Sequence, residues 1–117
     1  MCKLVPYKDG KFVADIKMDC INNIVEQAKK TENISRVMLF GSSLEVRCNE
    51  LSDVDIAVFG TKTSGNYLRS KEYRDFTSSI YKYDWNQDYD FLYFKEGKEY
   101  KEPIMQHINK GVEIYRR

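Results

Sequence analysis

The chain has 117 residues, which is enough for one domain with a single hydrophobic core and too few for a separate substrate-binding domain. Its 19 basic and 18 acidic residues nearly cancel, which excludes the strong positive field of a generic nucleic-acid-binding protein, so we expect no direct nucleic-acid binding. No apolar stretch approaches the ~20 residues of a membrane span and the N-terminus lacks a signal-peptide core, so we expect a cytoplasmic protein without membrane association.

The first half of the chain predicts a hairpin, a helix and a strand. Asp9-Gly10 is a turn signal between two short apolar segments, so about the first 15 residues should form a hairpin or an irregular arm. From about residue 17, apolar residues recur at helical spacing as far as Ala28. Ile34 to Phe40 is a short apolar run that ends at a glycine, as a buried strand does. Ser42 and Glu45 then form an S-x-x-E capping box, which predicts a short helix directly after the strand.

The next elements are a strand, a loop and a helix. Asp53 to Phe59 is the second predicted strand, and Gly60 to Asn66 is a polar loop whose composition is typical of mobile segments. The helix that follows should pack one apolar stripe on the sheet. The stripe consists of Tyr73, Phe76, Ile80 and Tyr83.

The C-terminal part predicts a strand, a helix and a final short strand. Tyr89 to Phe94 is the third strand, and Pro103 begins a last helix that Gly111 ends. That helix should place one face on the core, formed by Ile104, Met105 and Ile108. Val112 to Tyr115 is then a short final strand. Since helices alternate with strands, residues 1–117 are expected to form a single α/β or α+β domain with a mixed sheet of about four strands flanked by helices.

Two carboxylates open the second strand. Because side chains in a strand alternate between faces, Asp53 and Asp55 should point the same way, and Mg²⁺ prefers such oxygen ligands. Upstream, the Gly41-Ser42-Ser43 turn offers backbone N–H groups and a hydroxyl for phosphates. Two Mg²⁺ ions could then clamp the attacking and leaving oxygens of a nucleotidyl transfer. The alternative is structural: Ser42 only caps a helix and both aspartates are solvated.

A third carboxylate is expected from another strand. Asp90 lies inside the apolar run from Tyr89 to Phe94, where a charge is costly unless it is paired or bound to metal. Asp90 is therefore our choice for the third acid. Asp88 shares its face and remains the alternative, although it lies at the frayed start of the strand.

With these residues the chain resembles the minimal nucleotidyltransferases of the DNA polymerase β superfamily. Their signature is a Gly-Ser pair, ten further residues, an Asp-x-Asp motif and an isolated Asp on a later strand. The matching positions are Gly41, Ser42, Asp53, Asp55 and Asp90. The chain departs from the family pattern at Val46, where many relatives carry a small residue. The resemblance implies that the three aspartates hold two Mg²⁺ ions and that Gly41, Ser42 and Ser43 bind the triphosphate of ATP.

Stand-alone members of this size are often antitoxins that are paired with a HEPN-domain toxin, an all-helical ribonuclease, and that transfer AMP from ATP to a toxin tyrosine. The resemblance therefore implies a magnesium-dependent protein adenylyltransferase with a HEPN-type partner. The small size of the chain points the same way, because a domain this small cannot also build a deep acceptor pocket. Two alternatives stay open, a non-catalytic toxin-binding module and a nucleotidyltransferase for small molecules such as antibiotics. A homo-oligomer is also possible.

The other reactive side chains are interpreted as structural. His107 is the single histidine and lacks an orienting partner, which favours a surface or packing role. The nine tyrosines and Trp85 are expected in the core or an interface. A solvated face accounts for the cations Arg47, Lys62, Arg69 and Lys71. Reduced thiols are expected at Cys2, Cys20 and Cys48.

Overall fold

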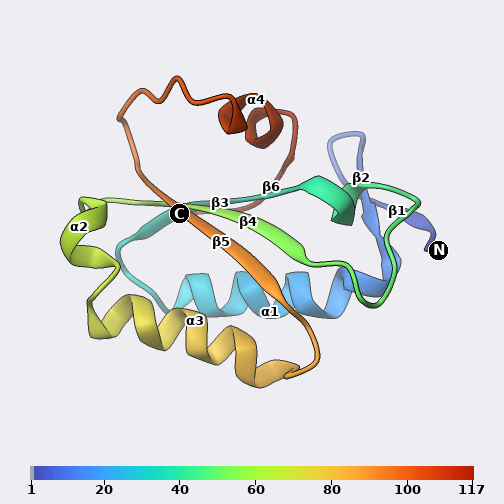
Figure 1. Cartoon of the computed structure of the whole chain (residues 1–117), viewed down its shortest axis with the longest axis horizontal. Helices are drawn as coiled ribbons and strands as arrows, with labels where there is room; N and C mark the ends of the chain where they lie inside the picture. The colour runs from blue at the N-terminus through green and yellow to red at the C-terminus, as the bar shows by residue number, and fades with distance from the viewer. Residues whose placement is uncertain (1) are drawn as a thin grey trace.

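A four-stranded sheet lies between two layers of helices in the computed structural model, which describes residues 2–117 (Figure 1). The strand order is β5-β4-β3-β6. β3 (Ile34–Phe40) pairs antiparallel with β4 (Val54–Gly60) and with β6 (Val112–Arg116), whereas β4 and β5 (Tyr89–Lys95) run parallel. The prediction of a mixed four-stranded sheet with flanking helices is confirmed.

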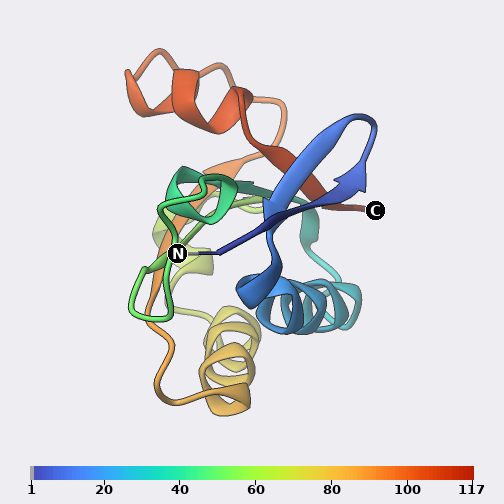
Figure 2. The ribbon, with the colours of Figure 1, turned by 90° about the vertical axis from the view of Figure 1, so that its right-hand side faces the viewer.

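The two faces of the sheet are covered unequally. Helices α1 (Met18–Lys29) and α3 (Lys71–Tyr83) lie under one face, and the shorter α4 (Ile104–Asn109) lies over the other (Figures 1 and 2). In β4, the residues packed with α1 and α3 are Val54, Ile56 and Val58, and those packed on the α4 side are Ala57 and Phe59. By the same alternation, the preceding odd-numbered residues Asp53 and Asp55 lie on the α4 side.

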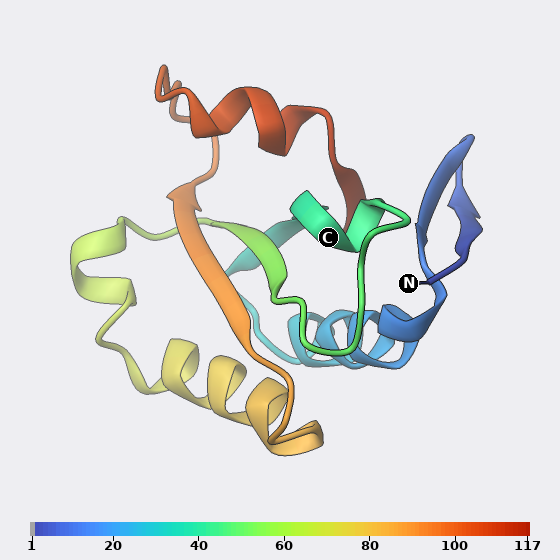
Figure 3. The ribbon, with the colours of Figure 1, turned by 45° about the vertical axis from the view of Figure 1, so that its right-hand side comes forward.

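The N-terminal segment is the hairpin that its turn signal predicts. β1 (Leu4–Lys8) and β2 (Lys11–Ala14) pair antiparallel around a turn in which Asp9 and Gly10 have positive φ angles of 50° and 75°. A short 3-10 helix, η1 (Asp15–Lys17), leads from the hairpin into α1. The hairpin stands beside the end of the sheet at which β4 begins (Figure 3).

Two expectations for the region before β5 are wrong in part. The predicted mobile loop from Gly60 to Asn66 begins inside β4 and ends inside a helical turn, α2 (Ser64–Tyr67). In α3, Tyr73, Phe76 and Ile80 are buried as predicted, but the Tyr83 side chain is 53% exposed. α3 ends at Tyr83 and the chain turns away there toward β5, so the stripe has no sheet to cover at its last position.

Alanine substitutions at the two ends of this stripe should differ sharply. Ile80→Ala removes a fully buried side chain and is expected to lower the free energy of unfolding by about 2–5 kcal/mol. Tyr83→Ala is expected to change it by less than about 1 kcal/mol because the ring is mostly solvated. Urea denaturation of both variants checks this difference, and equal losses would contradict the placement of Tyr83.

α4 contributes less to the core than its sequence suggests. Ile108 is fully buried, whereas Ile104 is 36% exposed. The helix ends at Asn109 with Lys110 as its C-cap, so Gly111 follows the helix end as the sequence predicts. Gly111 also allows close packing, since a Cβ atom there would overlap the carbonyl oxygen of Leu39 in β3. Within residues 2–117, no helix is both long enough and apolar enough to cross a membrane.

Candidate active site

The three aspartates chosen from the sequence come together at one end of the sheet, on the face that α4 only partly covers. Asp55 is in register with Asp90 on the parallel neighbour β5 and with Phe40, the last residue of β3. Asp53 lies one residue before β4 and continues the same face. The end of β3 and the starts of β4 and β5 therefore form one row of polar positions.

Within residues 2–117, the negative charge of this row is not paired with a lysine or arginine side chain. The pKa of Asp55 is raised above its usual value, first by burial and then by the negative charges of Asp90 and Asp53. Asp55 is half-buried, while Asp53 and Asp90 are exposed. Among residues 2–117, no salt bridge or side-chain hydrogen bond engages any of these three carboxylates. The three carboxylates therefore have no side-chain partner within the described residues.

The sequence argument for Asp90 as the third acid, its burial in an apolar strand, is wrong. The choice of Asp90 itself stays a prediction, for two other reasons. Asp90 is exposed, so burial in an apolar strand does not single it out. Its register with Asp55 does, and so does its effect on the Asp55 pKa. Asp88 lies one step further along the face, where its carbonyl oxygen accepts a 3.1 Å hydrogen bond from the Val54 N–H. The charge of Asp88 is not among the causes that raise the Asp55 pKa.

Gly41 lies in close contact with the Asp55 carboxylate. The residue begins η2 (Gly41–Leu44), the short 3-10 helix that follows β3, and has a positive φ of 77°. A Cβ atom on Gly41 would overlap the Asp55 Oδ2 atom. Two independent constraints, a left-handed backbone and close contact with a carboxylate, therefore require glycine here.

The predicted capping box after Gly41 is wrong. The turn is a 3-10 helix of four residues whose N-cap position is Phe40, and no side chain caps it. The Ser42 hydroxyl donates a long hydrogen bond of 3.4 Å to the Asp53 carbonyl oxygen. Glu45 lies at the C-terminal end of the turn and forms a salt bridge with Arg47 at 2.9 Å. Ser42 thus links the turn to the residue that opens the aspartate motif.

The two motif serines are placed differently. Ser42 is half-buried, whereas Ser43 is fully buried and its hydroxyl has no partner within the described chain. The Ser43 hydroxyl is therefore not presented at the surface of the turn. Val46, where the chain departs from the family pattern, is 58% exposed in the loop that follows.

The donor set fits magnesium bound together with a nucleotide. No three His, Cys, Asp or Glu side chains in residues 2–117 converge closely enough to hold a metal ion by themselves. Mg²⁺ is usually bound by one or two carboxylates, with substrate phosphates and water as the remaining ligands. Carboxylates without protein partners, beside a glycine turn, meet that requirement when a triphosphate supplies the other oxygens.

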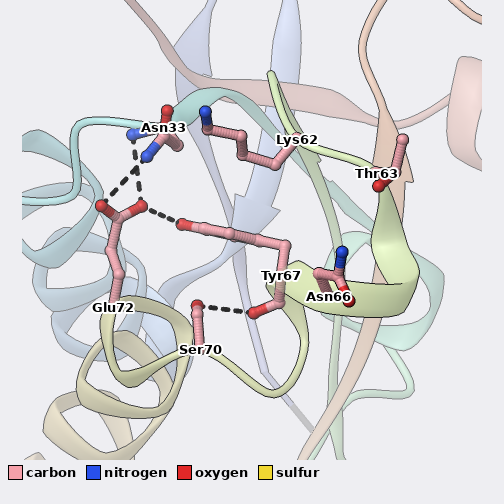
Figure 4. A pocket seen from close by; sticks show the side chains of 7 residues that line it. All are labelled: Asn33, Lys62, Thr63, Asn66, Tyr67, Ser70 and Glu72. Atoms are coloured by element: carbon pink, nitrogen blue, oxygen red, sulfur yellow. Dashed lines mark hydrogen bonds between the residues drawn. The ribbon is translucent and has the colours of Figure 1, made fainter.

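A pocket of about 340 Å³ lies beyond the opposite end of β4 (Figure 4). Glu72 lines one side of it: the carboxylate accepts hydrogen bonds from the backbone and side-chain nitrogens of Asn33, at 3.4 and 3.1 Å, and from the Tyr67 hydroxyl. Lys62 lines the same pocket. The length of β4, at ~3.3 Å per residue, separates this pocket from the aspartates. It is therefore not part of the carboxylate site.

Most of the remaining reactive side chains fit the structural interpretation. His107 is exposed on α4, and Lys71 forms a salt bridge with Asp75 at 2.7 Å. All three cysteines are free. Two residues that no sequence signal identified do lie behind the aspartates: Lys17 and Gln87 are only 1% and 5% exposed. A lysine beside a helix start is ordinarily solvated, so nothing local reveals its burial.

A family model described as polymerase beta nucleotidyltransferase matches residues 22–117. A search of curated proteins finds no match.

Similar solved structures come from toxin–antitoxin systems. A tri-AMPylated HEPN toxin in complex with an MNT antitoxin from Shewanella oneidensis gives 17% identity and a TM-score of 0.56, over 86% of this chain and 73% of that chain. A toxin–antitoxin with AMP-PNP gives 19% identity and a TM-score of 0.61, over 83% of this chain and 73% of that one. A mutant of the MntA–HpeT toxin–antitoxin gives 16% and 0.58, with coverage of 83% and 73%. At these identities the likeness shows the fold.

Proposed function

The chain belongs to the polymerase beta nucleotidyltransferase family, and from this we propose that it transfers AMP from ATP to a tyrosine hydroxyl of a HEPN-type partner protein. The observation that carries the proposal is the alignment of Asp55 with Asp90, next to Gly41, in a row of carboxylates without protein partners. The acceptor class is supported by the similar fold of an MNT antitoxin in complex with a tri-AMPylated HEPN toxin. The fold of a toxin–antitoxin with AMP-PNP supports an adenine nucleotide as substrate.

The roles of the residues follow from the chemistry of the transfer. The tyrosine oxygen forms a bond to the α-phosphorus of ATP, the bond from that phosphorus to the β-phosphate oxygen breaks, and pyrophosphate leaves. Asp53 and Asp55 would hold the metal ions, and Asp90 would complete the metal site on the side of the attacking oxygen and help to accept the phenolic proton. When bound, two Mg²⁺ ions would neutralise charge on the attacking and leaving oxygens. Gly41, Ser42 and Ser43 hold the triphosphate through backbone N–H groups and the Ser42 hydroxyl.

The openness of the site supports a protein as acceptor. Asp53 and Asp90 are exposed, so a tyrosine on the surface of another protein can approach them. α4 packs on the apolar part of the same face, in one cluster with Ala57 and Phe59. A small-molecule acceptor would be enclosed by few side chains at this site. A partner protein would instead surround the reacting tyrosine with its own residues.

The test is a transfer assay with the protein encoded by the adjacent gene. The purified pair is incubated with Mg²⁺ and labelled ATP, and the partner is analysed by intact mass spectrometry. We expect AMP adducts on the partner, located on tyrosine by peptide mapping and abolished by EDTA. A folded pair that forms a complex without any adduct would contradict the proposal and favour neutralisation by occlusion.

Asp88 and Asp90 provide a matched pair for the third carboxylate. They lie on one face at the start of β5 and are both exposed. Asp90→Asn should lower the rate of AMP transfer by about 10²–10⁴, the usual contribution of a general base. Asp88→Asn should lower it by less than about tenfold, since a charge that does not raise the Asp55 pKa is remote from that carboxylate. Single-turnover rates at saturating ATP measure both, and the reverse order would assign the role to Asp88.

A further inference from the structure

Lys17 is a buried lysine without an ion-pair partner in the described part of the chain. It ends η1, directly before α1, and its side chain is 1% exposed. The ammonium group donates to Gln87 Oε1 at 2.6 Å, to the Ser52 carbonyl at 2.8 Å and to the Glu50 carbonyl at 3.5 Å. Three donors thus meet three neutral acceptors. Burying a charge costs free energy unless hydrogen bonds to the protein replace those to water. The three acceptors make that replacement, and they fix the position of the Lys17 side chain.

Gln87 connects the Lys17 network to the start of β5, the strand that carries Asp90. Its side-chain amide nitrogen donates to the Ser52 carbonyl at 3.0 Å and to the Asp88 carbonyl at 2.7 Å. The Asp88 carbonyl also accepts the Val54 N–H at 3.1 Å. Lys17 and Gln87 together therefore join the residue before Asp53 to the residues that lead into Asp90.

Asp53 needs such support because the sheet does not hold it. Asp53 precedes β4, at the end of the loop that starts after η2. In Figure 3 this loop descends from η2 and then rises into β4, and its Glu50 and Ser52 carbonyls accept from Lys17 at the end of η1. Asp55 is in register with Asp90 and lies two residues after Asp53, and like charges at this range repel one another. The hydrogen bonds from Lys17 and Gln87 to the Ser52 carbonyl oppose the movement that this repulsion favours.

We propose that Lys17 and Gln87 are positioning residues that fix the spacing between Asp53 and Asp90 for the metal and its nucleotide. This inference rests on the proposed function. It also adds a residue from outside the family match, because Lys17 lies before residues 22–117. The N-terminal hairpin and η1 thereby become part of the active-site framework, since they carry Lys17 to its place.

The experiment measures metal binding and local opening, neither of which needs an acceptor protein. Mn²⁺ affinity is determined by electron paramagnetic resonance with a non-hydrolysable ATP analogue, and amide exchange of Val54 is measured by NMR in metal-free protein. Lys17→Met removes the ammonium group at similar length. The control is Ile24→Ala, which leaves a cavity beside α1 because the Ile24 side chain is fully buried. Both variants are studied well below their melting temperatures.

Lys17→Met is expected to weaken Mn²⁺ binding at least tenfold and to speed exchange at Val54 more than at Leu39 in β3. Ile24→Ala is expected to speed both amides alike and to leave Mn²⁺ affinity within twofold of wild type. Equal Mn²⁺ affinity in the two variants would overturn the proposal. Mn²⁺ binding too weak to detect in wild type would count against the proposed function, and the exchange comparison would then decide the positioning role alone.

Gln87→Glu is the second variant in case Lys17→Met does not fold. The new carboxylate still accepts from Lys17, but it cannot donate to the carbonyls of Ser52 and Asp88. Loss of positioning predicts Mn²⁺ binding at least fivefold weaker, even though an added negative charge near the site would tighten it. Unchanged or tighter binding overturns the proposal.

Discussion

Asp55→Asn is expected to abolish AMP transfer and, in the metal-free protein, to raise stability. Loss of one metal-binding carboxylate should lower the transfer rate by about 10³ or more, because metal ions contribute several kcal/mol of transition-state stabilisation. The same change removes a charge whose ionisation is opposed by burial and by Asp90 and Asp53. For a half-buried group we expect a gain of at most about 1 kcal/mol. Activity and stability thus change in opposite directions.

The stability gain has a defined pH dependence. Because the folded-state pKa of Asp55 is raised above 3.8, the folded protein holds this proton more tightly than the unfolded chain does. Wild-type stability therefore falls as pH rises from 3.8 through the raised pKa, and the penalty is complete above it. The gain in Asp55→Asn should be full at neutral pH and should vanish below 3.8. Urea denaturation at both pH values measures it.

Asp75→Asn is the matched control. Asp75 is an exposed aspartate on α3 whose pKa is lowered, chiefly by its hydrogen bond to Lys71. Its replacement should leave AMP transfer unchanged and should not stabilise the protein at neutral pH. Destabilisation by Asp55→Asn at neutral pH would show that the carboxylate is compensated inside the folded protein. Retained transfer would remove Asp55 from the metal site.

Local periodicity explains what could be predicted from the sequence. Alternation along a strand requires only the neighbouring residues, and so the strands and the common face of Asp53 and Asp55 follow from the chain alone. The exposure of Asp90 could not be predicted, because it depends on how far α4 extends over the sheet. Lys17 and Gln87 are separated by 70 positions in the chain, and only the folded structure brings them together. The capping box failed because the turn after β3 is a four-residue 3-10 helix that begins at Gly41, so Ser42 lies inside the turn and not at its N-cap.

Gly41→Ala is expected to lower both the stability and the transfer rate. The new methyl group would displace the Asp55 carboxylate, although all three carboxylates remain present. Alanine at a φ of 77° is strained, at a cost of about 1–3 kcal/mol. Its Cβ would also overlap Asp55 Oδ2, so the carboxylate must shift. A displacement of about 1 Å at a reacting group can lower a rate about 10²-fold, and we expect a loss of that order.

Gly10→Ala separates the two costs. Gly10 has nearly the same φ, 75°, but a Cβ atom there would meet nothing within 4 Å. It should therefore show the backbone strain alone and keep full transfer activity. The difference between the two alanine variants in free energy of unfolding then measures the contact with Asp55.

A double-mutant cycle assigns that difference to Asp55. In an Asp55→Ala background the Oδ2 atom is gone, so Gly41→Ala should cost no more than Gly10→Ala does. The expected coupling energy between positions 41 and 55 is about 1–2 kcal/mol, within the range for side chains in direct contact. Urea denaturation of the four proteins provides it. A coupling near zero would mean that Gly41 is required only for its backbone angle, and the glycine of the motif would then bear on the phosphate turn and not on the metal carboxylate.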